Sequence, residues 1–151
     1  MRTFDHSLPM ALLRARESIM EYFRPLLKAL KLTEQQWRII RVLYEQHDME
    51  FHELARITCI LPPSLSGMLT RLERARLLKR SKPATDQRRL HVALTREGTE
   101  RFTQMSEQME LAYCEIETQF GKRRLATLFE LLQSARQLQS GGPHTAKESM
   151  R

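Results

Sequence analysis

The spacing of hydrophobic residues in the first third of the chain predicts helices. Apolar side chains recur every three or four positions over residues 8–30, which indicates a helix of about six turns with a kink at Pro25. A second helix is expected to begin after Thr33, because its hydroxyl can cap the first turn while Gln36 completes a capping box. This second helix should end near His47.

Two short helices are expected next, separated by a turn at residues 59–61. The first covers residues 51–57, and its inward side chains are Phe51, Leu54, Ala55 and Ile57. The second begins at Pro62, since proline is tolerated in a first helical turn whose amides lack partners anyway. Its buried stripe comprises Leu65, Met68 or Leu69, Leu72 and Ala75.

The periodicity then changes to that of β-strands and back again. Residues 77–82 and 90–94 are candidate strands, and the polar residues 83–89 join them as a hairpin. Thr95 can cap a long helix that Gly121 interrupts, and a last helix extends to Leu138. Residues 140–151 are small and polar, which is typical of a disordered tail.

This order of elements predicts a mainly α-helical protein with a winged helix-turn-helix. The winged lobe is expected over residues 33–95, with a two-stranded antiparallel wing. The helices of residues 1–32 and 96–139 are too long and apolar to lie bare around so small a lobe. We therefore expect them to form a dimerisation domain and the protein to be a homodimer.

The positive charge of the chain is concentrated in one short segment. The sequence has 25 Lys and Arg against 18 Asp and Glu, a net charge of +7. Residues 71–90 contain eight basic and two acidic residues, so this window alone carries +6. A charge run is usually a solvated face, but a run beside a helix-turn-helix pattern indicates a surface for double-stranded DNA.

Other classes of protein lack support in the sequence. No run of ten uninterrupted apolar residues occurs, and the N-terminus has no apolar signal segment, so a cytoplasmic protein without a membrane span is expected. Cys59 and Cys114 are too few for a disulfide scaffold, and the five histidines show no metal-ligand spacing. No phosphate loop or nucleophile elbow is present, so we expect no enzyme activity, cofactor or metal.

The segment that begins at Pro62 is the predicted recognition helix for the major groove. Its exposed arc offers hydroxyl and guanidinium donors that can reach base edges or phosphates. Gly67 on the same arc either leaves room for close approach to a base or is merely tolerated in the helix. These residues are Ser64, Ser66, Gly67, Thr70, Arg71 and Arg74. Lys79, Arg80 and Lys82 are expected to contact phosphates, which adds affinity but no sequence information.

Four segments of the chain resemble the MarR family of bacterial transcriptional regulators, and the resemblance extends over residues 8–138. They are residues 32–37 (LTEQQW), 64–73 (SLSGMLTRLE), 86–89 (DQRR) and 94–98 (LTREG). Residues 22–25, 32–38 and 59–65 are further similar to those family members that repress operons for homoprotocatechuate degradation. The resemblance implies repression of genes for 4-hydroxyphenylacetate breakdown from a palindromic operator, with DNA released when a phenolic or phenylacetic acid binds.

The resemblance also assigns roles to residues of the wing. It implies that Arg88 enters the minor groove while Asp86 steadies the wing, and Arg89 beside them is a second basic candidate. Many family members have glycine where this chain has Arg76. A left-handed helix cap is less favourable there for arginine, so we expect the chain to enter the wing by another route.

Effector sites in the family lie between the dimerisation helices and the DNA-binding lobe. An aromatic carboxylate needs a cation, an apolar slot and a donor for its phenol. The candidates are Arg14, Arg16, Trp37, Arg38 and His52, with Arg16 favoured as the carboxylate partner. A salt bridge remains the alternative for Arg16, and a core position the alternative for Trp37.

Two other functions stay open at this point. The chain could be a MarR-type regulator of another phenolic ligand, an antibiotic or an oxidant. Redox-sensing relatives carry a cysteine near the start of the chain, whereas Cys59 and Cys114 lie elsewhere and are expected to be inert. A non-specific basic DNA-binding protein would bind all DNA fragments equally.

Overall fold

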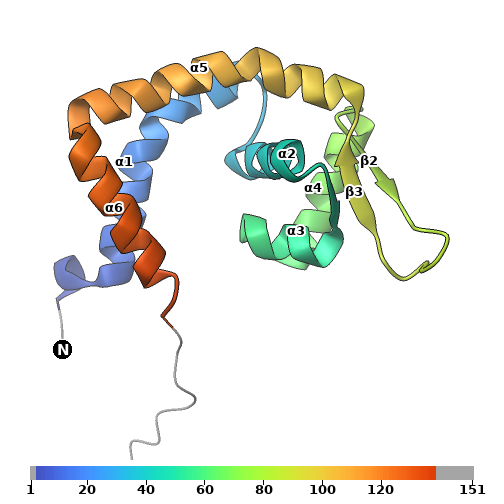
Figure 1. Cartoon of the computed structure of the whole chain (residues 1–151), viewed down its shortest axis with the longest axis horizontal. Helices are drawn as coiled ribbons and strands as arrows, with labels where there is room; N and C mark the ends of the chain where they lie inside the picture. Colours follow the sequence, from blue (N-terminus) through green and yellow to red (C-terminus); the bar gives the residue numbers. More distant parts are fainter. Residues whose placement is uncertain (1–2, 139–151) are drawn as a thin grey trace, which may run out of the picture. The chain divides into compact units, whose positions relative to one another are not determined.

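The computed structural model describes residues 3–138, which divide into two compact units at Tyr113 and Cys114. The predicted tail at residues 140–151 therefore lies outside the described residues. Along the chain the elements are η1 (Phe4–His6), α1 (Leu8–Ala29), α2 (Glu34–Gln46), β1 (Asp48–Glu50), α3 (Phe51–Thr58), α4 (Pro62–Arg74), β2 (Leu78–Ser81), β3 (His91–Leu94), α5 (Arg96–Phe120) and α6 (Lys122–Ala135) (Figure 1).

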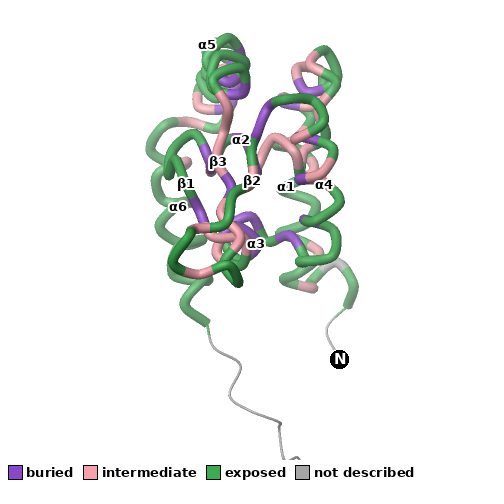
Figure 2. Tube along the Cα trace, turned by 90° about the vertical axis from the view of Figure 1, so that its right-hand side faces the viewer, coloured by how far each residue is buried: buried purple, intermediate pink, exposed green. Residues whose placement is uncertain are grey.

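The first unit contains the predicted winged helix-turn-helix. Helices α2, α3 and α4 bury their apolar stripes together with the strands, and Figure 2 marks the buried positions in purple. Ile39, Leu54, Leu65, Leu69 and Val92 are completely inaccessible to solvent. The loop between β2 and β3 projects away from the helices as a wing (Figure 1).

The start of α2 agrees with the sequence prediction. The Thr33 hydroxyl accepts a hydrogen bond from the Gln36 amide at 3.1 Å, and the Gln36 side chain accepts one from the Thr33 amide at 3.0 Å. This capping box satisfies two amides that have no partner within the helix.

The sheet has three strands, so the prediction of a two-stranded wing was incomplete. β3 pairs with β2 in antiparallel orientation, with Leu78 opposite Leu94. Its other edge pairs with β1, also antiparallel, with Met49 opposite Val92. β1 is only three residues long, too short to show an alternating pattern in the sequence. Met49 is the one buried side chain of β1, and it packs into the core of the winged lobe at that edge of the sheet.

The end of α4 contradicts the expected route into the wing. Arg76 adopts the left-handed conformation with φ of 61°. The Arg76 amide donates to the Glu73 carbonyl at 2.9 Å, and the Leu77 amide donates to the Leu72 carbonyl at 3.0 Å. These two bonds form a Schellman-type cap, so the bonds and the burial of Leu77 outweigh the preference for glycine at this position.

Several smaller boundaries also differ from the prediction. Ile57 and Ala75 were expected to be inward but are exposed, because α3 and α4 end close to each of them. The strands are shorter by one or two residues than residues 77–82 and 90–94, and α6 ends at Ala135. In the described part of the chain, no helix is long and apolar enough to span a membrane.

Apolar side chains remain exposed on the helices outside the winged lobe. On α1 of the first unit they are Leu8, Leu12, Leu13 and Ile19. On α6 of the second unit they are Phe129, Leu131 and Leu132. The assignment of residues 1–32 and 96–139 to dimerisation stays a prediction.

Candidate nucleic-acid interface

The exposed face of α4 presents the predicted base-reading residues together. Ser64, Ser66, Gly67, Arg71 and Arg74 are exposed. Thr70 is half-buried, and its hydroxyl donates to the Ser66 carbonyl one turn earlier at 3.1 Å.

Gly67 lies on this face without any packing reason for a glycine. A Cβ added there would meet only the end of the Arg71 side chain, 3.8 Å from its Nη2 atom. Gly67 has no left-handed conformation and no crowded backbone neighbour. Gly67 therefore has no internal packing role, and both interpretations, close approach of a partner and mere tolerance of the glycine, stay predictions.

The basic residues of α4 and the wing fall into two groups. Within residues 3–138, the side chains of Arg71, Arg74, Lys79, Lys82 and Arg88 have no ion-pair partner. Arg80 and Arg89, in contrast, face carboxylates of the same lobe. The unpaired group is the one that can bind an external anion without first breaking an internal contact.

Arg80 connects the wing to the recognition helix. Its Nε donates to the Glu73 carboxylate at 2.9 Å, and its Nη2 donates to the same oxygen. This hydrogen bond lowers the pKa of Glu73 below its ordinary value. Arg80 was predicted to bind phosphate, but in this structure its guanidinium holds β2 against the last turn of α4.

The loop of the wing is organised by Asp86. Its carboxylate accepts a hydrogen bond from the Arg88 amide at 3.0 Å, and its backbone carbonyl accepts one from the Arg89 amide at 3.3 Å. The Arg89 guanidinium lies 3.7 Å from the Asp86 carboxylate and 4.0 Å from that of Glu50. These contacts shape the turn and leave the Arg88 side chain exposed.

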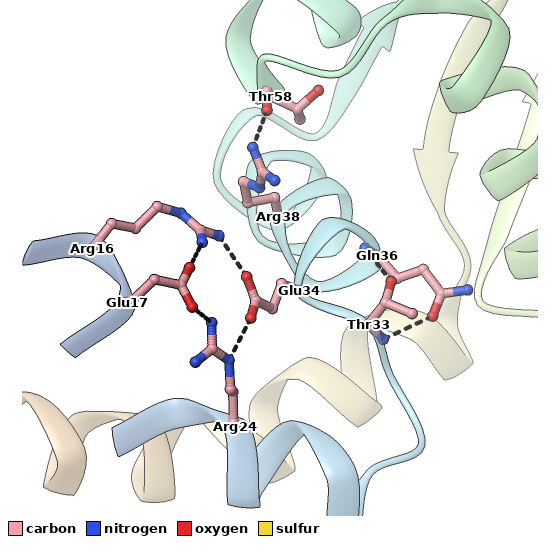
Figure 3. A network of polar contacts seen from close by, with 8 residues as sticks. All are labelled: Arg16, Glu17, Arg24, Thr33, Glu34, Gln36, Arg38 and Thr58. Carbon is pink, nitrogen blue, oxygen red and sulfur yellow. Dashed lines mark hydrogen bonds and ion pairs between the residues drawn. The ribbon is translucent and has the colours of Figure 1, made fainter. Parts of the chain in front are cut away.

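The favoured effector residue, Arg16, belongs to a ring of charges between α1 and α2 (Figure 3). Its guanidinium donates to Glu17 at 3.0 Å and to Glu34 at 2.5 Å. Arg24 closes the ring through Glu34 at 2.8 Å and through Glu17. The hydrogen bonds from Arg16 and then Arg24 lower the pKa of Glu34.

An aromatic cluster lies beside α2 in the same unit. The Trp37 ring stacks on Phe102 with a centroid distance of 5.1 Å, and Tyr44 stacks on the same ring at 4.0 Å. Trp37 is half-buried and packs against the core, as the alternative interpretation expected.

Arg41, which lies one helical turn after Trp37, was not among the site residues predicted from the sequence. The Arg41 Nη1 atom donates to the Tyr113 hydroxyl at 2.7 Å, and the guanidinium lies over the Tyr113 ring at 5.6 Å. The sequence did contain a signal for it: Arg41 follows Trp37 by four positions, which places a cation and an aromatic ring on the same face of the helix.

The other three predicted effector residues make contacts elsewhere. The Arg14 guanidinium lies over the Phe4 ring, and Arg38 donates to the Thr58 carbonyl at 2.7 Å. His52 is exposed on α3. A cavity of about 440 Å³ is lined instead by Leu43, Tyr44, His47, Asp48, Lys79, Ala93, Leu94 and Thr99. Across the described ranges, no group of three His, Cys, Asp or Glu side chains could hold a metal ion.

Comparison with known proteins agrees with this geometry. The family model described as MarR family matches residues 32–90. The homoprotocatechuate degradative operon repressor of Escherichia coli is 51% identical over 127 residues, covering 84% of this chain and 86% of the repressor. The chain belongs to the MarR family.

Two solved structures show the same architecture as this MarR-family chain. The regulator PA4135 is 47% identical with a TM-score of 0.85, covering 88% of this chain and 98% of its own. NadR in complex with 4-hydroxyphenylacetate is 40% identical with a TM-score of 0.80, covering 92% of this chain and 99% of its own. These relatives are regulators and not enzymes, in agreement with the prediction from the sequence.

Proposed function

We propose that this MarR-family protein is a cytoplasmic, ligand-responsive repressor of an operon for aromatic-acid catabolism. It binds a palindromic operator as a homodimer and releases it when a phenolic acid binds. The observation that carries the proposal is the 51% identity, over most of both chains, to a repressor of homoprotocatechuate degradation. The solved relative that binds 4-hydroxyphenylacetate supports the same class of ligand.

The arrangement of basic residues supports the DNA-binding half of the proposal. α4 enters the major groove, where Arg71 can bind a guanine edge through two hydrogen bonds. The exposed Arg88 of the wing loop reaches a narrow minor groove, whose negative potential attracts arginine. Lys79 and Lys82 are left to bind phosphates, since neither has an ion-pair partner among the described residues.

The exposed apolar helices support the homodimer. Leu8, Leu12 and Ile19 of α1 lie at helical spacing and remain exposed in a single chain, as do Phe129 and Leu132 of α6. Apolar faces of this extent mark protein interfaces in soluble proteins. A two-fold dimer presents two α4 helices about one turn of DNA apart, which requires a palindromic site.

The effector site is proposed at Arg16 and the aromatic cluster around Trp37. An arginine supplies the cation for a carboxylate, and the aromatic rings of α2 and α5 supply the apolar slot. Arg41, beside the same cluster, is a second cation for this site. Binding to Arg16 competes with Glu34, so the ligand would loosen the contact between α1 and α2. The ligand then favours a dimer whose two α4 helices no longer match the operator.

The experiment that tests this function is selection of genomic fragments by the purified protein, followed by footprinting of the recovered DNA. We expect one palindromic site, protected in two half-sites, upstream of genes for aromatic ring cleavage. Equal recovery of all fragments would instead favour the non-specific DNA-binding protein. A single protected site next to genes of another pathway would favour a regulator of another stimulus.

A further inference from the structure

Arg38 of α2 makes a contact that the effector proposal does not use. Its Nη1 atom donates a hydrogen bond of 2.7 Å to the backbone carbonyl of Thr58, and Figure 3 shows this side chain directed away from the charge ring. Thr58 is the last residue of α3 and is buried. The contact therefore joins the first turns of α2 to the C-terminus of α3.

The carbonyls at the end of α3 need partners from outside the helical ladder. The Ile60 amide satisfies the Ala55 carbonyl at 3.1 Å, and the Cys59 amide satisfies that of Arg56 at 3.4 Å. In the described part of the chain, Thr58 has the only backbone carbonyl at the end of α3 that accepts a hydrogen bond from a side chain of another helix. A positive group at a helix C-terminus also interacts favourably with the helix dipole.

Only three residues separate Thr58 from the recognition helix. Cys59 is left-handed with φ of 53°, and Ile60 is buried with 4% of its surface exposed. Leu61 caps α4 without a side-chain hydrogen bond, and Pro62 begins the helix. A turn so short transmits any shift of the α3 terminus directly to the start of α4.

We infer that Arg38 is a positioning residue for DNA recognition: it fixes the turn between α3 and α4 and so the placement of α4 in the major groove. The inference rests on the proposed DNA-binding function. Arg38 itself need not touch DNA or the effector. Its loss would misplace base contacts, which require defined geometry, while phosphate contacts tolerate small shifts.

Arg101 provides a control with the same chemistry at a different helix. Its Nη2 atom donates to the Leu30 carbonyl at 2.8 Å, at the C-cap of α1. Arg101→Met therefore removes one positive charge and one arginine–carbonyl bond, as Arg38→Met does. Only the hydrogen bond that Arg38→Met removes lies within the helix-turn-helix.

The test is fluorescence anisotropy of the full chain with operator DNA and with a scrambled duplex of equal length. Wild type, Arg38→Met, Arg38→Lys and Arg101→Met are compared, and urea unfolding of each variant measures its stability. For Arg38→Met we expect operator affinity to fall about tenfold, as loss of one charge-assisted hydrogen bond allows, with scrambled-DNA affinity equal to that of Arg101→Met. Arg38→Lys, which restores the positive charge, should recover part of the selectivity.

The outcomes that would overturn the role of Arg38 differ from the outcome that would overturn the proposed DNA-binding function. Equal losses on operator and scrambled DNA, or unchanged selectivity in Arg38→Met while wild type is selective, would overturn the positioning role alone. No recovery of selectivity by Arg38→Lys, together with a loss of stability that accounts for weaker binding, would also overturn it. A wild-type protein that does not distinguish the two duplexes would overturn the proposed function as well.

Discussion

Gly98, in the first turn of α5, lies against the backbone carbonyl of Leu77 at the base of the wing. A Cβ at Gly98 would be 1.9 Å from the Leu77 oxygen, a distance that backbone atoms cannot accept. The Leu77 carbonyl also accepts the Thr95 amide at 3.1 Å, and the Thr95 hydroxyl donates to the Arg76 carbonyl at 2.5 Å. The glycine therefore allows the end of α4, the wing and the start of α5 to meet.

We predict that Gly98→Ala destabilises the protein by about 1–3 kcal/mol, the usual cost of forcing extra volume into a packed site. The measurement is urea unfolding followed by circular dichroism. Gly67→Ala is the matched control, because open space surrounds that position. It should stabilise α4 by up to about 1 kcal/mol, the difference between glycine and alanine in a helix interior. Equal stability of the Gly98→Ala variant and wild type would contradict the observed packing.

The residues around Gly98 also show what the sequence could and could not predict. The segment at residues 94–98 identified the family, but periodicity gives no distance between Gly98 and Leu77. The helices followed from hydrophobic spacing and from caps such as Thr33 and Gln36, which are local features. β1 was missed because its pairing with β3 joins residues far apart in the chain and only Met49 is buried. The left-handed Arg76 was missed for a related reason, since the bonds that stabilise it depend on how the next strand packs.

The same limit applies to the candidate site. The exposed face of α4 and the basic wing followed from local charge and from the position of each residue along a helix. Ion pairing did not follow, so Arg80 and Lys79 looked equivalent although only Arg80 is bonded to Glu73. Arg41 was overlooked because its aromatic partner, Tyr113, is far away in the sequence.

The difference between Lys79 and Arg80 predicts different salt dependence of DNA binding. Lys79→Met should reduce the slope of log affinity against log salt concentration by about 1, because one phosphate contact is lost. Arg80→Met should change the slope less and weaken operator binding through the wing, since Arg80 is held by Glu73. Operator affinities measured from 50 to 300 mM salt test both. A larger slope change for Arg80→Met than for Lys79→Met would contradict the assignment.

The Glu73–Arg80 pair predicts a pH dependence of stability. Because the hydrogen bond lowers the pKa of Glu73 in the folded state, its contribution is fully present above the ordinary carboxyl pKa and is lost as the pH falls through the lowered value. The stability difference between wild type and Glu73→Gln should therefore be largest near pH 7 and shrink as the pH falls below the ordinary carboxyl pKa of 4.5. Glu73 is partly exposed, so the difference will be small. A difference that grows on acidification would show that the pair does not act in this way.

Arg16 is the residue that best separates effector response from DNA binding. We predict that Arg16→Ala retains operator binding but is no longer released by 4-hydroxyphenylacetate, because the ligand carboxylate loses its cation. Arg14→Ala is the control, since Arg14 lies over Phe4 and not in the charge ring. Gel-shift titrations with the ligand distinguish the variants. Normal release of the Arg16→Ala complex would exclude this residue as the carboxylate partner and leave Arg41 as the candidate.

Ligand-controlled release of the operator is measured most directly by a fluorescence anisotropy titration of the wild-type protein on its operator with 4-hydroxyphenylacetate. We expect the ligand to release the operator in a saturable manner, while acetate at the same concentration and ionic strength leaves the complex intact. An operator complex that is equally stable with 4-hydroxyphenylacetate, homoprotocatechuate and acetate would contradict it.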